Sequence, residues 1–155
     1  LKGLSPKENR EIPPLKYDWA HRLKAERPQL PVVLNGGIAT LAVAREQLQQ
    51  VDGVMLGRAA YHDPYLLHLL EAEHTGMPVC SRTELLRAFQ PYVVCWLERG
   101  LALKHITRHV LGLYAGQPGG RAFRQVLSEG AHRPGAGWEL VEAAIAVTSE
   151  GRGQC

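Results

Sequence analysis

Two short apolar runs, each ending in a glycine turn, constrain the fold of this chain most. Residues 30–40 read LPVVLNGGIAT and residues 51–61 read VDGVMLGRAAY. Both runs are continuously apolar rather than alternating, which is typical of strands buried on both faces of a parallel sheet. Two parallel strands alone cannot bury both faces. The pattern therefore predicts the last part of a larger α/β sheet or barrel.

The segments around these strands predict an αβαβα alternation. We expect a helix over residues 17–27, a strand over 31–35, a helix from Thr40 to about 48, a strand over 53–56 and a helix that starts at Asp63-Pro64. Thr and Asp are favoured N-caps, and Pro is favoured at the first helical position. Residues 1–16 show no such period and predict a long loop.

From about residue 80 the pattern contains helices only. Ser81-x-x-Glu84 is a capping box, and four apolar stretches at helical spacing follow it. The first ends at Gly100, the second runs from Leu103 and ends near residues 116–120, the third starts over residues 121–127 and the fourth covers residues 138–147. The predicted fold class is therefore α/β followed by all-α. Residues 1–79 form the sheet or barrel segment, residues 80–150 form a small four-helix bundle, and residues 151–155 form a disordered tail, because SEGRGQC has no apolar anchor.

Composition excludes several classes of protein. A hydrophobic content of 45% in 155 residues is enough for a core and argues against wholesale disorder. No apolar run reaches membrane-spanning length. The first residue is not Met, so we expect a piece of a longer chain. Cys80, Cys95 and Cys155 are odd in number and widely spaced, which argues against a disulfide framework or a zinc site and favours a reducing, cytosolic setting.

Positive charge is concentrated in the second half of the chain. The net charge of +3 lies entirely in residues 80–155, because residues 1–79 hold equal numbers of basic and acidic residues. Residues 101–133 carry five Lys or Arg residues against Glu129 alone. Such a surface suits a polyanion, although a solvated helix face explains the same charge pattern. Arg121 and Arg124 share one helical face, which suits either reading.

The two glycine turns predict a phosphate site. Asn35-Gly36-Gly37 follows one strand and precedes a helix, where glycine allows close backbone approach and the helix start offers N–H groups. Gly57-Arg58 repeats this arrangement one strand later and adds a guanidinium. The alternative is that these glycines only make tight turns.

The remaining candidate side chains predict no metal centre. His105 and His109 lie one helical turn apart, but no third ligand is evident beside them. We favour a surface or nucleic-acid contact for this pair. Cys95 is expected to be a buried structural thiol, and nothing in the sequence supports a catalytic role for Cys80.

Four segments carry a resemblance to a known family. They are GLSPKENREIPPL at 3–15, NGGI at 35–38, DGVMLGRAAYHDPYL at 52–66 and GGRAFRQVLSE at 119–129. In this order and spacing they resemble the C-terminal half of bacterial tRNA-dihydrouridine synthases, most closely the A-type. The resemblance covers nearly the whole chain.

The resemblance implies a fold and a reaction. An FMN-binding (β/α)8 TIM barrel would be followed by a helical tRNA-binding domain, with tRNA between them. Reduced FMN, recharged by NADPH, would deliver a hydride to C6 of a D-loop uridine, and a cysteine would protonate C5. That cysteine is expected upstream of Leu1, so no catalytic residue is assigned in this chain and the fragment alone is expected to be inactive.

The resemblance also implies site residues and partners. Asn35, Gly36, Gly37, Gly57 and Arg58 would hold the FMN phosphate. Four basic residues would contact tRNA, namely Lys7, Arg10, Arg121 and Arg124. The expected partners are tRNA and NADPH, without DNA or a membrane, in the cytoplasm. The resemblance does not specify which D-loop uridine is modified.

Two other functional classes stay open at this point. One is a non-catalytic RNA-binding fragment. The other is a different flavin- or phosphate-binding barrel oxidoreductase with a small-molecule substrate.

Overall fold

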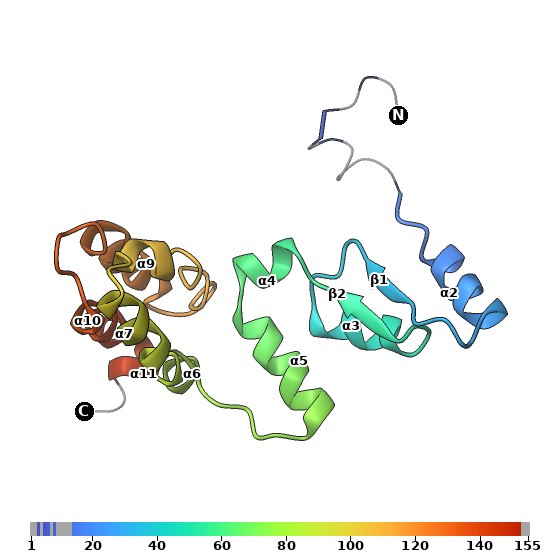
Figure 1. The fold of residues 1–155 in the computed structure, drawn as a ribbon. Coiled ribbons are helices and arrows are strands. Elements are labelled where there is room, and N and C mark those ends of the chain that lie inside the picture. Colours follow the sequence, from blue (N-terminus) through green and yellow to red (C-terminus); the bar gives the residue numbers. More distant parts are fainter. Residues whose placement is uncertain (1–2, 4, 7, 9–13, 153–155) are drawn as a thin grey trace. The chain divides into compact units, whose positions relative to one another are not determined.

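The computed structural model describes residues 3, 5, 6, 8 and 14–152, and these fall into two compact units, Leu1–Leu56 and Gly57–Cys155 (Figure 1). The predicted tRNA contacts Lys7 and Arg10 lie outside the described residues. Among the helices that are described, none is long and apolar enough to cross a membrane.

The first unit contains a parallel pair of strands. Within the described residues the sheet consists of β1 (Val33–Asn35) and β2 (Gly53–Met55), with Val33 opposite Gly53 and Asn35 opposite Met55. Helix α3 (Leu41–Leu48) connects them, and Thr40 caps it by accepting a hydrogen bond from the Val43 amide at 3.2 Å. The predicted parallel pairing and the predicted cap are both confirmed.

The strand pair buries only part of its apolar surface. Leu34 and Ala44 are buried in this unit, and α3 contacts β2. Val33 is 63% exposed and Met55 is 46% exposed. Because side chains alternate across a strand, Val33 lies on the opposite face from Leu34. The burial of both faces expected from the sequence is thus absent within the described residues.

Helix α2 (Tyr17–Glu26) contributes no buried side chain to this unit, as far as it is described. Its contacts are polar. His21 Nε2 lies 2.8 Å from Gln47 Oε1, and Lys24 Nζ lies 2.8 Å from Asp52 Oδ1. The Asp52 carboxylate also accepts a hydrogen bond from the Val32 amide at 2.7 Å. The bond from Lys24 is the largest cause of a lowered pKa for Asp52, and the Val32 amide adds to it.

Among its described residues the second unit contains helices joined by turns and no strand. Its helices are α4 (Arg58–His62), α5 (Tyr65–Thr75), α6 (Arg82–Ala88), α7 (Gln90–Glu98), α8 (Leu103–Thr107), α9 (Gly120–Gly130), α10 (Trp138–Ala146) and α11 (Ser149–Arg152). The capping box is confirmed, since Ser81 Oγ accepts from the Glu84 amide and the Glu84 carboxylate accepts from the Ser81 amide.

Three sequence expectations about these helices need correction. The first predicted bundle helix divides at Phe89, and Pro91 lies in the first turn of α7, where its missing N–H costs nothing. The second ends at Thr107 rather than near residues 116–120. The expectation of a disordered tail is wrong for Ser149–Arg152, which form a short helix. In this helix Glu150 Oε2 accepts a hydrogen bond from the Thr83 amide at 3.0 Å.

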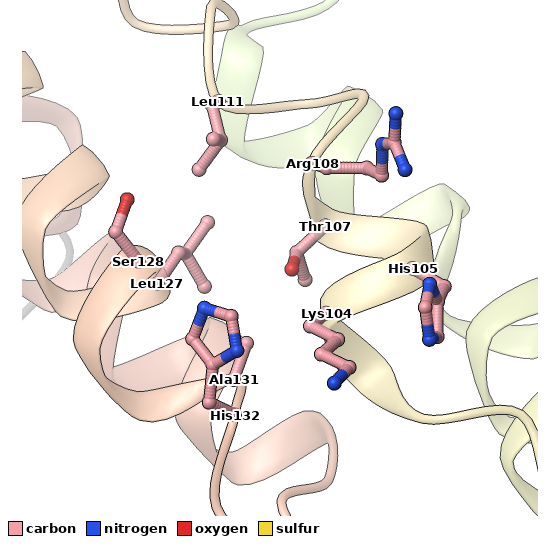
Figure 2. Close-up of a pocket in the computed structure, with 9 residues that line it drawn as sticks. All are labelled: Lys104, His105, Thr107, Arg108, Leu111, Leu127, Ser128, Ala131 and His132. Atoms are coloured by element: carbon pink, nitrogen blue, oxygen red, sulfur yellow. The ribbon is translucent and has the colours of Figure 1, made fainter.

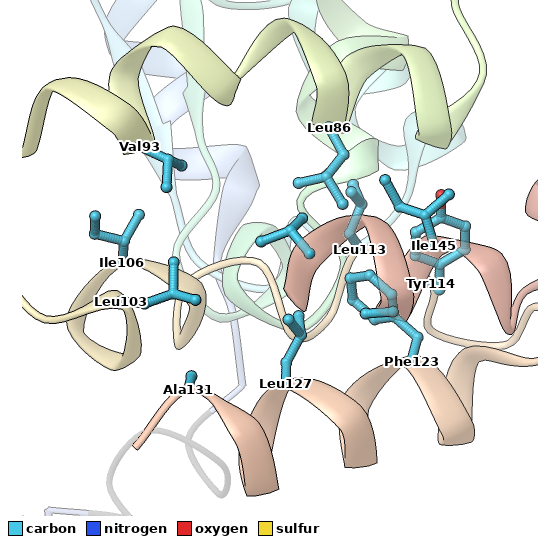
Figure 3. Close-up of a cluster of buried hydrophobic side chains, with 12 residues drawn as sticks. Leu86, Val93, Leu103, Ile106, Leu113, Tyr114, Phe123, Leu127, Ala131 and Ile145 are labelled. Atoms are coloured by element: carbon cyan, nitrogen blue, oxygen red, sulfur yellow. The ribbon is translucent and has the colours of Figure 1, made fainter. Parts of the chain in front are cut away.

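An apolar cluster packs helices α6 to α10 of the second unit together (Figure 3). Phe123 and Leu127 of α9 point into it, and Tyr114 lies with its ring centre 4.6 Å from that of Phe123. The buried Tyr114 hydroxyl is satisfied by Thr83 Oγ1 at 2.7 Å. Burial raises the pKa of Tyr114, and the Thr83 bond opposes this effect.

The segment between α5 and α6 is fixed by backbone hydrogen bonds at Cys80. The Cys80 amide donates to His68 Nε2 at 2.9 Å, and its carbonyl accepts from the Tyr65 hydroxyl at 2.6 Å. Helices α4 and α5 belong to the same compact unit as the later helices. The boundary between residues 79 and 80 stays a prediction from the helix-only sequence pattern that begins at about residue 80.

Candidate functional site

The turn after β1 has the backbone that its glycines predict. Gly36 has a φ of +124° and Gly37 a φ of +64°, a region that other residues rarely adopt. The Gly36 carbonyl accepts a hydrogen bond of 2.6 Å from the Tyr17 hydroxyl. Helix α3 begins four residues after Gly37, so its first N–H groups follow the turn directly.

Two side chains cover the same turn. A Cβ atom placed on Gly37 would lie 2.5 Å from Leu15 Cδ1 and 2.9 Å from Tyr17 Oη. A larger residue here would have to displace the flexible ends of Leu15 and Tyr17, so the positive φ is the stronger reason for glycine at this position. The sequence predicted the glycines but neither Leu15 nor Tyr17, because both lie about twenty residues earlier and no spacing rule connects them to the turn.

Gly57-Arg58 has a different local structure. Gly57 has φ −97° and ψ −90°, so it is not held in the left-handed region. Arg58 is exposed and begins α4, directly after the chain leaves β2. The paired residues Asn35 and Met55 end the two strands side by side, so each motif follows immediately from a paired strand end.

The predicted RNA-binding arginines occupy an exposed helix face. Arg121 and Arg124 are both exposed on α9, whereas Phe123 between them is fully buried. The expectation that the two arginines share one helical face is confirmed, and Phe123 packs away from that face.

A cavity of about 380 Å³ lies between α8 and the C-terminal part of α9 (Figure 2). The residues that line it are Lys104, His105, Thr107, Arg108, Leu111, Leu127, Ser128, Ala131 and His132. The sequence indicated the basic residues only as part of a general charge excess. Their spacing on two separate segments gave no signal that they would surround one cavity.

The two histidines that could have suggested a metal site have other surroundings. The His109 ring packs edge-on against Tyr61 at 5.8 Å between ring centres, and Nδ1 lies 3.3 Å from the Tyr61 hydroxyl. His105 lines a second cavity of about 320 Å³ beside Phe89 and Tyr92. Within the part of the chain that the structure describes, no group of His, Cys, Asp or Glu could hold a metal ion.

The cysteine expectations are only partly met. Cys95 is half-buried rather than fully buried, and Cys80 is exposed. Neither cysteine belongs to the candidate phosphate-binding residues or to the candidate RNA-binding residues.

Comparison of the sequence with known proteins identifies a family that it matches. The profile of the dihydrouridine synthase (Dus) family matches residues 2–149. A protein named tRNA-dihydrouridine(20/20a) synthase from Xanthomonas campestris pv. campestris is 71% identical over 150 residues, which cover 97% of this chain and 45% of that protein. Proteins of the same name from Xylella fastidiosa and Yersinia pestis are 59% and 48% identical and are covered to 44% of their lengths.

The chain thus spans less than half the length of the relatives it matches. The matched region includes both glycine turns and the arginine-bearing helix α9. On this evidence the chain belongs to the dihydrouridine synthase family.

Proposed function

We propose that the full-length protein is an A-type, FMN-dependent tRNA-dihydrouridine synthase that uses NADPH to reduce D-loop uridines to 5,6-dihydrouridine. The observation that carries this proposal is the 71% identity to a relative whose name specifies positions 20 and 20a. We extend those positions, and a cytoplasmic location, to this protein. Residues 1–79 then form the C-terminal segment of a TIM barrel, and residues 80–150 form the tRNA-binding domain.

The residues after β1 and β2 fit a bound phosphate. Gly36 and Gly37 hold positive-φ conformations at the end of β1, and α3 begins close behind them. A helix start directs N–H groups and the positive end of its dipole towards an anion. Arg58, three residues beyond the last paired residue of β2, adds a guanidinium that suits phosphate oxygens.

By resemblance, we assign Asn35, Gly36, Gly37, Gly57 and Arg58 to the binding of the FMN phosphate. When bound, FMN supplies the hydride-transfer chemistry of the proposed reaction. The contribution of this chain is to bind and orient the phosphate end. Tyr17 supports that role by fixing the Gly36 carbonyl.

The charge of the helical unit supports an RNA substrate. Arg121 and Arg124 are exposed on α9, in a stretch where basic residues outnumber acidic ones by five to one. Basic side chains on one face release counterions from a phosphate backbone, which makes binding favourable and dependent on salt. Lys7 and Arg10 are proposed as further contacts by resemblance.

The exposed strand face supports the barrel assignment. Val33 and Met55 are large apolar side chains, and exposing them on a strand pair is unfavourable. Further strands of a barrel would cover this face. No residue of this chain is assigned the proton-donor role.

The proposal is tested with the full-length protein, FMN, NADPH and an unmodified tRNA transcript. We expect tRNA-dependent NADPH oxidation and dihydrouridine at positions 20 and 20a, detected by mass spectrometry of RNase fragments. Tight tRNA binding with no dihydrouridine would favour a non-catalytic RNA-binding protein. Turnover of a small molecule alone would favour a different barrel oxidoreductase.

A further inference from the structure

The cavity between α8 and α9 has basic residues at its sides. Figure 2 shows the His132 ring and the Lys104 side chain on opposite sides of the gap between the two segments. Arg108 lies one helical turn after Lys104, at the rim, with its guanidinium directed away from the gap. Both Lys104 and His132 are exposed, so their polar ends are accessible to a ligand.

The inner surface of the cavity is less polar. Leu127 is 1% exposed and Ala131 is 3% exposed, and the half-buried Leu111 completes the apolar wall. Thr107 is buried and donates its hydroxyl hydrogen to the Leu103 carbonyl at 3.2 Å. At the opening, the exposed Ser128 offers a hydroxyl that can donate or accept a hydrogen bond.

The cavity continues the face that carries the two arginines. Arg121, Arg124, Ser128 and His132 follow one another at intervals of three, four and four residues. Residues at these intervals form one stripe along a helix. Arg121, Arg124 and Ser128 are exposed on α9, so the stripe runs from the arginine pair to Ser128, which lines the cavity. The exposed His132 lies two residues beyond the end of α9.

We propose that this cavity is a subsite for one unpaired nucleotide of the RNA substrate. The inference rests on the proposed function, because it takes the RNA to be the ligand of α9. Lys104 binds the phosphate, and Arg108 adds positive charge at the rim. The base lies against the accessible part of Leu111, beside the His132 ring.

The shape and the charge of the cavity both favour a nucleotide. Unstacked bases bind to apolar and aromatic surfaces, and His132 provides a ring at the mouth. The volume of about 380 Å³ lies within the range of small-molecule sites, which is roughly 300–1,000 Å³. A carboxylate side chain of a protein partner would pair with Lys104 but would leave the apolar wall unfilled.

Two variants of the full-length protein distinguish the contribution of the Lys104 charge from that of the open volume of the cavity. Lys104→Ala removes the ammonium group that binds the phosphate. Ser128→Phe fills the mouth of the cavity without changing any charge. Arg99→Ala is the matched control, because it removes one exposed positive charge of the same unit outside the cavity. Unmodified tRNA transcript is titrated into each variant at several salt concentrations, and circular dichroism melting checks that each is folded.

We expect Lys104→Ala to weaken tRNA binding about tenfold, because a charged hydrogen bond is removed, and to lower the slope of log K against log salt by about 0.7–0.9. Ser128→Phe should weaken binding about as much. Arg99→Ala should change neither the affinity nor the slope.

The results distinguish this subsite from the proposed function. Wild-type affinity and slope in both Lys104→Ala and Ser128→Phe, with weakened binding in Arg121→Ala/Arg124→Ala, would overturn the subsite and leave the function intact. If polyglutamate competed for the Lys104 site as effectively as RNA does, the nucleotide assignment would be overturned. If the enzyme makes no dihydrouridine and no variant changes RNA binding, the function fails and the subsite fails with it.

Discussion

The guanidinium of Arg82 lies 4.0 Å from the centre of the Tyr65 ring, so the first residue of α6 stacks on the first residue of α5. The same guanidinium donates to Asp63 Oδ1 at 3.1 Å and to the Leu113 carbonyl. Its side chain is only 10% exposed. One cation thereby joins the start of α5, the start of α6 and the loop after α8.

Because of these contacts, we expect substitution of Arg82 to destabilise the protein more than substitution of an exposed charged residue. Arg82→Leu should lower the free energy of unfolding by about 2–3 kcal/mol, because the buried Leu113 carbonyl loses its donor and Asp63 its partner. Arg87→Leu on the same helix is the control. Arg87 is 44% exposed in its pair with Glu142, so its removal should cost less than about 1 kcal/mol. Urea unfolding of the two variants compares them, and equal losses of stability would contradict the argument.

The Arg87–Glu142 pair predicts a pH effect on stability. Hydrogen bonding from Arg87 is the largest cause that lowers the pKa of Glu142 below its ordinary value of 4.5, and the Trp138 indole N–H contributes. A carboxyl with a lowered pKa in the folded state stabilises the protein above its unfolded pKa. This contribution is lost as the pH falls through the folded pKa.

We therefore expect stability to decrease as the pH falls below 4.5, by under about 1 kcal/mol, since Glu142 is 38% exposed. Glu142→Gln should reduce this pH dependence relative to the wild-type protein. Urea midpoints at about pH 6 and about pH 3.5 measure the difference. An unchanged pH dependence in Glu142→Gln would refute the assignment.

The hydrogen bond from Tyr17 to Gly36 predicts an effect on cofactor affinity. Tyr17→Phe removes the donor of a 2.6 Å bond while keeping the ring. A bond of this kind contributes about 0.5–1.5 kcal/mol, so the full-length protein should bind FMN about 2- to 10-fold more weakly. Fluorescence titration with FMN measures this, with Tyr92→Phe on α7 as the matched control. Identical FMN affinities in both variants would remove Tyr17 from the site.

The exposed arginine pair on α9 predicts salt-dependent RNA binding. Arg121→Ala/Arg124→Ala in the full-length protein should weaken tRNA binding and lower the salt slope by about 0.7–0.9 for each phosphate that the protein no longer binds. NADPH oxidation without tRNA should stay near the wild-type rate. Arg99→Ala removes one exposed charge outside residues 101–133 and serves as the control. A double variant with unchanged affinity and slope would make these arginines an ordinary solvated surface.

Burial predicts different protection of the two units in this chain alone. Phe123 of α9 and Ala144 of α10 are fully buried, whereas α2 buries none of its described side chains. Amides of α9 and α10 should therefore exchange at least about 10-fold more slowly than those of α2 and β1. Hydrogen exchange followed by mass spectrometry compares these peptides within one sample. Equal protection would show that the strand pair is stable without further covering elements.

The sequence predicted the helix starts that are fixed by contacts between residues close together in the chain. The Thr40 cap and the Ser81–Glu84 capping box act within three residues, so sequence spacing was enough. The end of α8 was missed because its cause is distant. A Cβ atom on Gly112 would collide with the His62 carbonyl oxygen, so close packing against α4 decides the path of that segment. Helix α11 likewise depends on the bond between Glu150 and the Thr83 amide, 67 residues apart.

The candidate site divides in the same way. Gly36 and Gly37 were predictable, because a strand, two glycines and a helix follow one another directly in the sequence. The covering residues Leu15 and Tyr17 were not, since only the folded chain brings them to the turn. The cavity beside Lys104 and His132 also arises only when α8 and α9 pack together.

The Tyr17 hydroxyl has a reciprocal consequence for the first unit. It holds the Gly36 carbonyl, and it belongs to the first residue of α2, a helix whose own contacts are largely polar and exposed. By thermodynamic linkage, the free energy by which docked α2 strengthens ligand binding at the turn equals the free energy by which the bound ligand strengthens the docking of α2. An occupied turn therefore orders a helix that the ligand itself need not touch.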